Sequence, residues 1–287
     1  MVVYDESALG ALIPHPARDA NKYSRGHVLL VGGSSPYPGA VALAAQAAQR
    51  SGAGYTEAFV DENIQATVQG FRASVVVRAW SECTSSAVKR LAGRPHAFVV
   101  GCGFDARDAY AQSVFQTVLR AAEGPVLVDG GALRMLASKQ AAKQCGKRGA
   151  AGSATVLTPH AGEADALAQV AGIPSGNPRE LSQALSQAYS AICVLKGPDT
   201  YISDGRSNYR MDQGGPELAK AGTGDVLAGA IGALLAQGVG AYDAAVLGTH
   251  LHAKAARLAA DELGDVSVVP EDVLERLPQA ICAFAKG

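Results

Sequence analysis

Short apolar runs alternate along the chain with longer alanine-rich segments, and this alternation limits the fold more than any other feature. The runs have the length of β-strands: His27–Gly32, Tyr55–Val60, Ser74–Ala79, His96–Gly101, Pro125–Asp129, Ala154–Leu157 and Ala191–Lys196. Mostly apolar strands are typical of a sheet that is covered on both faces. The pattern predicts helices over Gly39–Ser51, Ala109–Ala121, Ala161–Ala171 and Glu180–Tyr189. We therefore expect an α/β fold in which βα units wind around one mostly parallel sheet.

The last third of the chain departs from this alternation. Tyr201–Ser203 and Ser207–Met211 flank Asp204-Gly205 and predict a hairpin at an edge of the sheet. Beyond the hairpin the pattern is helical over Thr223–Gln237, Ala241–Leu263 and Glu271–Ala285. Ser138–Ser153 is rich in Lys, Gln and Gly and predicts a surface loop or a frayed helix. No strong linker divides the sequence, so we expect one domain over residues 1–287.

Composition argues against several classes of partner. The formal net charge of -1 disfavours a nucleic-acid or anionic-membrane surface as the main partner. The longest apolar stretch, Val226–Ala236, is too short to cross a bilayer, and Asp5 and Glu6 stand where a signal peptide needs apolar residues. The five cysteines are scattered and form no C-x-x-C pair, which favours reduced thiols over disulfides or zinc. We expect a cytoplasmic protein that binds small molecules.

The strongest local signal is Gly222-Thr223-Gly224-Asp225, directly before the apolar segment Val226–Ala236. Glycines expose successive N–H groups, which together with a helix N-terminus form a cradle for a phosphate or a developing anion. A carboxylate in such a cradle repels an anion, so Asp225 is better explained as a base that deprotonates a hydroxyl. The alternative is a turn in which Thr223 or Asp225 caps the helix. An apolar helix must be buried, so its N-terminus faces a cleft, which favours the catalytic interpretation.

Two further polar loops follow apolar strands. Lys196-Gly197-Pro198-Asp199-Thr200 lies where open α/β sheets bind ligands, and its lysine could reach a phosphate, although a plain β-turn is the alternative. Thr158-Pro159-His160 opens a helix in which Glu163 suits the positive end. His160 could bind a ligand, or it could lie at the surface beside a Thr158 cap. We expect these loops to face one edge of the sheet.

Other patterns carry less weight. Gly101-Cys102-Gly103-Phe104-Asp105-Ala106 fits a dinucleotide fingerprint, but the acidic residue expected further on would be Asp129, which lies too far along. The loop Gly32–Ala40 lacks the Lys-Ser/Thr pair of a phosphate-binding loop and could contact a ligand or form a flexible lid. Asp129 could bind Mg²⁺ through water or cap a turn. His250 and His252 face different directions on a helix and do not form a metal-binding pair, and we assign no residue as a direct metal ligand.

Taken together, these motifs and their order resemble the ADP-dependent NAD(P)H-hydrate dehydratases of the ribokinase-like superfamily. The resemblance runs from about Lys22 to the C-terminus and depends on Tyr23-Ser24-Arg25-Gly26-His27, Gly39-Ala40, Thr158-Pro159-His160, Lys196–Thr200 and Ala221–Gly229. It implies a three-layer α/β/α fold. The chain is too short to include the epimerase domain of some relatives, so the expectation is a stand-alone dehydratase domain.

The resemblance also implies an activity. NADH or NADPH hydrated at C6 of the nicotinamide ring, in the S form, is phosphorylated at the hydroxyl by ADP or ATP, and phosphate then leaves to restore the double bond. Mg²⁺ would offset the nucleotide charge, and the protein would be a homo-oligomer, with a tetramer as the expectation. The family pattern assigns Asp225 as base with Gly222, Thr223 and Gly224 around the phosphoryl group. It assigns nucleotide contacts to Lys196, Gly197, Pro198, Asp199, Thr200 and Gly224, and hydrated-dinucleotide contacts to Ala40, Gly103, His160 and Asp225.

The chain departs from the family pattern at three positions. Relatives show Asp-x-Asp-Ala-Leu where this chain has Asp129-Gly130-Gly131-Ala132-Leu133, which weakens any role for a second carboxylate. The usual Pro after His160 is Ala161, and the usual G-P-G-[LM]-G loop reads Gly101-Cys102-Gly103-Phe104-Asp105. Two other functions stay open: a ribokinase-like kinase for a hydroxymethylpyrimidine or thiazole alcohol, and a non-catalytic nucleotide sensor. The Tyr23–His27 and Thr158–His160 motifs favour the dehydratase over the kinase.

Overall fold

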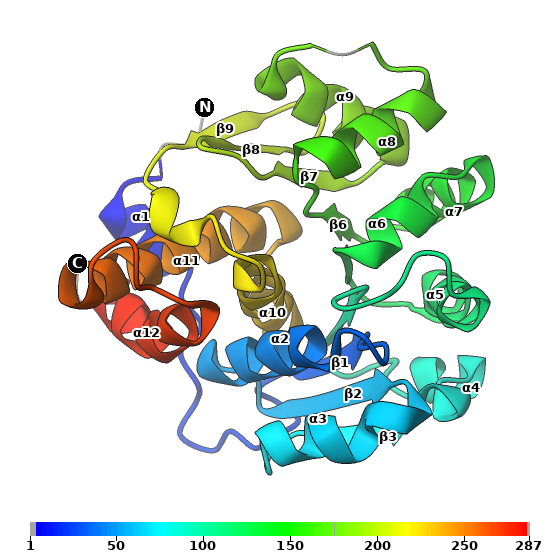
Figure 1. The fold of residues 1–287 in the computed structure, drawn as a ribbon, viewed down its shortest axis with the longest axis horizontal. Helices are drawn as coiled ribbons and strands as arrows, with labels where there is room; N and C mark the ends of the chain where they lie inside the picture. The colour runs from blue at the N-terminus through cyan, green and yellow to red at the C-terminus, as the bar shows by residue number, and fades with distance from the viewer. Residues whose placement is uncertain (1–3, 175, 286–287) are drawn as a thin grey trace.

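A single sheet runs through the middle of the molecule in the computed structural model, which describes residues 4–174 and 176–285 (Figure 1). Within these residues nine strands follow the order β3-β2-β1-β4-β5-β6-β7-β8-β9. Strands β1 to β7 are parallel, and β8 and β9 form the antiparallel hairpin predicted at the edge. The strands are β1 His27–Val31, β2 Tyr55–Val60, β3 Val76–Ala79, β4 His96–Val100, β5 Val126–Val128, β6 Thr155–Leu157, β7 Ile192–Leu195, β8 Thr200–Ser203 and β9 Asn208–Met211.

Helices cover both faces of the sheet, which confirms the predicted α/β/α layers (Figure 1). One face carries α2 Pro38–Arg50, α3 Gln65–Phe71, α10 Thr223–Ala236, α11 Ala241–Leu263 and α12 Pro270–Phe284, with α1 Glu6–Ala11 against α12. The other face carries α4 Ser85–Lys89, α5 Ala109–Ala121, α6 Gly131–Leu136, α7 Lys139–Ala150, α8 Ala161–Ala171 and α9 Pro178–Tyr189. The apolar strands are buried between these layers because both of their faces are covered.

Helix α10 is the most deeply buried helix of its layer, and its small residues explain why. A Cβ atom at Gly229 would lie 2.1 Å from the carbonyl oxygen of Ala44 in α2, and one at Gly232 would lie 2.3 Å from Val99 in β4. Only glycine allows these two close approaches, so α10 packs directly against both neighbours. Although α10 is apolar, the described part of the chain contains no helix with the length and hydropathy needed to cross a membrane.

The amino edge of the sheet is held by a buried carboxylate. Glu57 in β2 is 1% exposed and accepts from Nε of Arg78 at 2.5 Å and from the guanidinium of Arg90, while Nε2 of His27 lies 3.3 Å away. Burial alone would raise the pKa of Glu57, but the hydrogen bonds from His27, Arg90 and Arg78 lower it to about 2. The Tyr23–His27 motif therefore lies at the amino edge of the sheet, opposite to the carboxyl ends of the parallel strands, and supports the fold there.

Of the two alternatives predicted for Ser138–Ser153, the surface loop is wrong and the segment is helical. Residues Lys139–Ala150 form the regular helix α7, capped by the Ser138 side chain. Ala141, Cys145 and Arg148 are buried on one face of it. Arg148 is buried because its guanidinium donates to the carbonyl oxygens of Ala122, Gly124 and Ala154. A charged residue is thus part of the core, and the high content of polar residues in this segment did not predict its burial.

Candidate functional site

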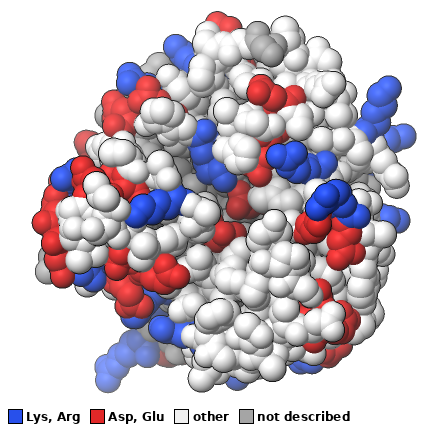
Figure 2. Space-filling model, viewed as in Figure 1, with Lys and Arg blue, Asp and Glu red and all other residues white. Residues whose placement is uncertain are grey.

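The loops that follow the parallel strands meet at the carboxyl edge of the sheet, next to the N-terminus of α10. This edge includes Ala40, the segment Gly101–Phe104, Asp129, His160 and Lys196. Figure 2 shows basic and acidic side chains gathered around a hollow near the centre of this face. The shared edge agrees with the expectation from the sequence, and the parallel order of β1 and β4 to β7 produces it.

Two cavities open at this edge. The hairpin cavity, of about 570 Å³, lies by β8 and includes Lys196, Gly197, Pro198, Thr200 and Gly224 in its wall. The central cavity, of about 560 Å³, includes Ala40, Gly103, His160 and Asp225. His160, Lys196, Thr223 and Gly224 belong to both walls, so the two cavities meet at the N-terminus of α10. Lys196 and Gly224, which the resemblance assigns to the nucleotide, and His160, which it assigns to the hydrated dinucleotide, therefore lie where the two cavities meet.

Asp199 is the exception among these residues. Its carboxylate pairs with the Arg210 guanidinium, with Nε of Arg210 3.0 Å from Oδ2, and it lies outside the wall of the hairpin cavity. The neighbouring Thr200 is buried at the start of β8 and faces the cavity. Of this loop, the structure therefore brings Lys196, Gly197, Pro198 and Thr200 to the cavity and directs the Asp199 side chain to the hairpin.

Asp225 occupies the first turn of α10 and faces the central cavity. Gly222 is the N-cap residue directly before the helix, and its φ of 101°, which favours glycine, turns the chain into the helix. Burial, and then the neighbouring carboxylate of Asp129, raise the pKa of Asp225 to about 7, against the lowering effects of Cys102 and Lys196. A carboxyl group with a pKa near neutrality is well suited to accept a proton from a hydroxyl.

Thr223 serves the backbone of this turn rather than the cavity. Its hydroxyl donates to the carbonyl oxygens of Leu218 at 2.8 Å and Lys220 at 2.9 Å. These bonds hold the loop before α10 against the first turn of the helix. Any contact between Thr223 and a phosphoryl group would therefore use its backbone N–H, which also donates to the carbonyl oxygen of Lys220 at 3.4 Å.

Lys196 connects the carboxylates of the site. Its Nζ lies 2.9 Å from Oδ1 of Asp129, which also accepts from the Thr158 hydroxyl at 2.6 Å. Burial lowers the pKa of Lys196, but Asp129, Glu163 and Asp225 outweigh burial and raise it. The ammonium group is therefore charged and lies between the two cavities. The sequence did not predict that Asp129 pairs with Lys196, because the two residues lie far apart in the chain.

His160 caps helix α8 instead of Thr158. Its Nδ1 accepts from the Gly162 N–H at 3.1 Å, and its own N–H donates to Oε2 of Glu163 at 2.9 Å. The His160 side chain is 55% exposed and lies in the walls of both cavities. Burial raises the pKa of Glu163, with Lys196 opposing the shift. The cap bonds thus position His160 at the cavity mouth, where it can contact a ligand.

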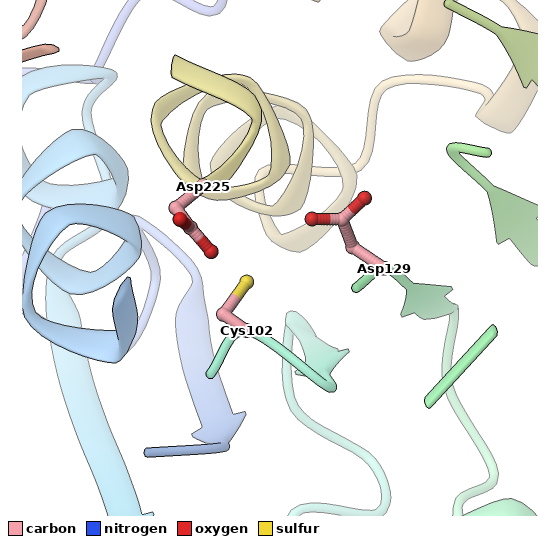
Figure 3. Close-up of side chains that lie close together, drawn as sticks. All are labelled: Cys102, Asp129 and Asp225. Atoms are coloured by element: carbon pink, nitrogen blue, oxygen red, sulfur yellow. The ribbon is translucent and has the colours of Figure 1, made fainter. Parts of the chain in front are cut away.

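Sequence reasoning missed two residues of this edge. His252 is buried in the wall of the hairpin cavity, and burial lowers its pKa to about 4, so the ring is neutral. It points away from His250, which hydrogen-bonds the Tyr209 hydroxyl at 2.9 Å. Cys102 is the second missed residue, and it lies against Asp129 and Asp225 (Figure 3). A signal for Cys102 was present, because it departs from the family loop.

The fold and the site together place the protein among the ribokinase-like α/β enzymes. Its Asp225 carboxylate and the N-terminus of α10 lie where the two cavities meet. The profile of a family described as NAD(P)H-hydrate dehydratase matches residues 28–279, and the chain belongs to this family.

Individual relatives agree with this assignment. The chain is 34% identical over 271 residues to a bifunctional NAD(P)H-hydrate repair enzyme of Coxiella burnetii, covering 93% of this chain and 52% of that protein. It is 30% identical over 284 residues to an ADP-dependent (S)-NAD(P)H-hydrate dehydratase of Xanthomonas campestris, covering 96% and 94%. The chain spans about half the length of the bifunctional relatives.

A solved structure extends the comparison to three dimensions. An ADP/ATP-dependent NAD(P)H-hydrate dehydratase of Bacillus subtilis, co-crystallised with ATP and Mg²⁺, superposes with a TM-score of 0.82. The two sequences are 25% identical, and the match covers 98% of this chain and 97% of that one. The ribokinase-like fold expected from the sequence is therefore confirmed.

Proposed function

We propose that this protein dehydrates the S epimer of hydrated NADH or NADPH, with ADP or ATP as the phosphoryl donor, and releases AMP or ADP and phosphate. One observation carries the proposal: Asp225, with a pKa raised to about 7, lies where a nucleotide-sized cavity meets a second cavity. Membership of the dehydratase family supports the substrate class. The activity restores usable reduced nicotinamide from a damaged form.

The residues divide the work along the two cavities. The hairpin cavity takes the adenine nucleotide, and its Lys196 contacts the phosphates. The central cavity takes the hydrated dinucleotide between Ala40, Gly103 and His160. Asp225 removes the proton of the C6 hydroxyl, and the N–H groups of residues 222–224 stabilise the transferred phosphoryl group. Departure of phosphate then restores the ring double bond.

The charges at the junction suit Mg²⁺. Asp129, Glu163 and Asp225 surround a single ammonium, Lys196, so three ionised carboxylates would leave two negative charges. Mg²⁺ prefers oxygen ligands and keeps several waters, and Asp129 has a second carboxylate oxygen to offer beside Lys196. When bound, Mg²⁺ would offset the charge on the nucleotide phosphates. Asp129, which lies in the wall of the central cavity, and bound phosphates would hold it.

Activity should depend on the ionisation of Asp225. Since a base must be deprotonated, kcat/KM should rise with pH, reach half of its maximum near pH 7 and level off above that. Adding Mg²⁺ should move this midpoint to lower pH, because a nearby cation favours the carboxylate. The same shift predicts that ionising Asp225 lowers stability as pH rises from about 3.8 to about 7. Initial rates of NADH recovery measure the profile, and a midpoint unmoved by Mg²⁺ would contradict it.

Lys196→Met should mainly weaken use of the nucleotide. Losing a charged hydrogen bond of about 1.5 to 3 kcal/mol predicts a decrease of about 10- to 150-fold in kcat/KM for ADP. The midpoint of the pH profile should also rise, because Lys196 lowers the pKa of Asp225. Lys139→Met, which removes an exposed lysine in α7, is the matched control. Equal effects of the two substitutions would exclude Lys196 from the nucleotide site.

The decisive experiment mixes hydrated NADH with the protein, Mg²⁺ and ADP or ATP, and follows absorbance at the reduced-nicotinamide band. We expect recovery of NADH together with one phosphate per turnover. A phosphorylated alcohol that accumulates from an alcohol panel, with no NADH recovery, would instead support a kinase. Nucleotide binding without turnover of any substrate would support a sensor.

We also propose a cytoplasmic location and a homo-oligomer, with a tetramer as the expected state. Both proposals rest on the family resemblance, and the modest net charge of -1 suits a small-molecule enzyme. Light scattering of the purified chain measures the state, and a monomer at micromolar concentration would rule out the oligomer.

A further inference from the structure

Three metal-ligating side chains converge at the carboxyl edge. The sulfur of Cys102, a carboxylate oxygen of Asp129 and one of Asp225 all lie within 4.8 Å of one another. They come from three separate places in the chain: the loop after β4, the residue directly after β5 and the first turn of α10. Figure 3 shows the Cys102 sulfur pointing between the two carboxylates.

We propose that Cys102, Asp129 and Asp225 form a binding site for one thiophilic divalent cation, such as Zn²⁺ or Cd²⁺. Such cations accept a mixture of sulfur and oxygen ligands and are commonly four-coordinate. Three protein ligands leave one position for water or a phosphate oxygen. The site differs in chemistry from the Mg²⁺ proposed above, because Mg²⁺ takes oxygen ligands and gains nothing from a thiol.

The spacing and the charges of the cluster fit this cation. Sulfur and oxygen ligands of one tetrahedral zinc ion lie roughly 3 to 4 Å apart, so separations within 4.8 Å need only small side-chain movements. One oxygen of Asp129 pairs with Lys196 and Thr158, which leaves its other oxygen for the ion. On binding, the Cys102 thiol releases its proton to solvent. A thiolate and two carboxylates then balance the cation together with the Lys196 ammonium.

The cation can reach the cluster from the central cavity. Asp129 and Asp225 belong to the wall of that cavity, whereas Cys102 is 2% exposed behind them. The thiol is therefore shielded from large reagents and available to an ion held by the two carboxylates. Bound there, the ion would occupy Asp225 and inhibit the enzyme, a consequence that rests on the proposed function. Binding itself does not depend on that function.

The test is a titration of the full-length protein with Cd²⁺ in the Cys282→Ala background, which removes the exposed thiol. We expect one equivalent to bind and to produce the ultraviolet absorption of a cadmium–thiolate bond. Cys102→Ala should abolish this absorption. It should also lower the affinity for Cd²⁺ by more than the roughly 10- to 100-fold that is typical when a residue that only hydrogen-bonds a metal ligand is removed. Cys193→Ala, which removes another buried thiol, should leave both unchanged.

A second variant tests a carboxylate of the site, and thermal unfolding checks that the variants fold. Asp225→Asn keeps the thiol and should weaken Cd²⁺ binding while a thiolate signal persists at higher concentration. Thermal unfolding of each apo variant checks that the fold is retained. The proposal is overturned if Cys102→Ala leaves the absorption in place, or if the parent protein binds no Cd²⁺. Since no substrate is added, a failure of the dehydratase proposal would leave these results unaffected.

Discussion

Replacing Asp225 by Asn should lower kcat by about 10²- to 10⁴-fold, the range by which a positioned general base accelerates proton transfer. Asparagine keeps the size of the side chain and cannot accept the proton. The hairpin cavity depends on other residues, among them Lys196 and Thr200, so nucleotide should still bind. Initial rates of NADH recovery and a separate measurement of ADP affinity would distinguish chemistry from binding.

Asp165→Asn is the matched control for this substitution. Asp165 is exposed on α8, two residues beyond Glu163, so the same change of charge is made outside the cavity walls. We expect its kcat to stay close to that of the parent protein. The limb of the pH profile near pH 7 should also vanish in Asp225→Asn, because the titrating group is gone. An unchanged rate or an unchanged limb would remove Asp225 as the base.

Glu57→Gln should cost about 3 kcal/mol of the free energy of unfolding at neutral pH. Removing one partner of a buried ion pair typically costs about 3 to 5 kcal/mol, and the low end applies because Arg78 and Arg90 are about 40% exposed. Denaturant titration measures the loss. Since hydrogen bonds lower the pKa of Glu57 from 4.5 to about 2, its contribution is complete above 4.5. The difference between the two proteins should shrink as pH falls through this range.

Glu275→Gln is the control, because Glu275 pairs with Arg50 at 2.6 Å on the surface and is 47% exposed. Exposed pairs contribute about 0 to 1 kcal/mol, so the variant should be nearly as stable as the parent. Any folded Glu57→Gln protein should keep its turnover, since Glu57 lies at the amino edge of the sheet. Equal losses of stability in the two variants would argue against a special role for the buried carboxylate.

Most of the fold follows from local sequence patterns. The predicted ranges Tyr55–Val60, Ala109–Ala121, Ala161–Ala171 and Ala241–Leu263 agree with β2, α5, α8 and α11 to the residue. These segments have a clear period or a long apolar run, bounded by glycine, proline or a capping residue. The sequence did not decide between a loop and a helix for α7, because the buried face of this helix includes Arg148, whose partners are carbonyl oxygens of other elements. The short helices α1, α3, α4 and α6 also escaped prediction, since each spans too few residues to reveal a period.

The site was predicted by residue but not by contact. Strand ends and the glycine-rich turn pointed to His160, Lys196 and Asp225, because parallel strands bring such loops to one edge. The ion pair between Lys196 and Asp129 joins residues on different strands, so no local pattern encodes it. The same holds for Cys102, whose significance comes from the two carboxylates beside it. Contacts between distant elements depend on strand order, which local sequence patterns do not fix.

The close packing of α10 has a consequence for how the protein could be adapted to other substrates. With Gly229 against Ala44 and Gly232 against Val99, the helix that carries Asp225 packs closely against α2 and β4, and larger residues at these two positions would displace it. Residues 212–222 lie just before it, contain no regular structure beyond the short turn Pro216–Leu218, and line both cavities through Leu218 and Ala219. Under the proposed function, redesign aimed at new acceptor alcohols should therefore target this segment, while the helix keeps the Asp225 carboxylate in place.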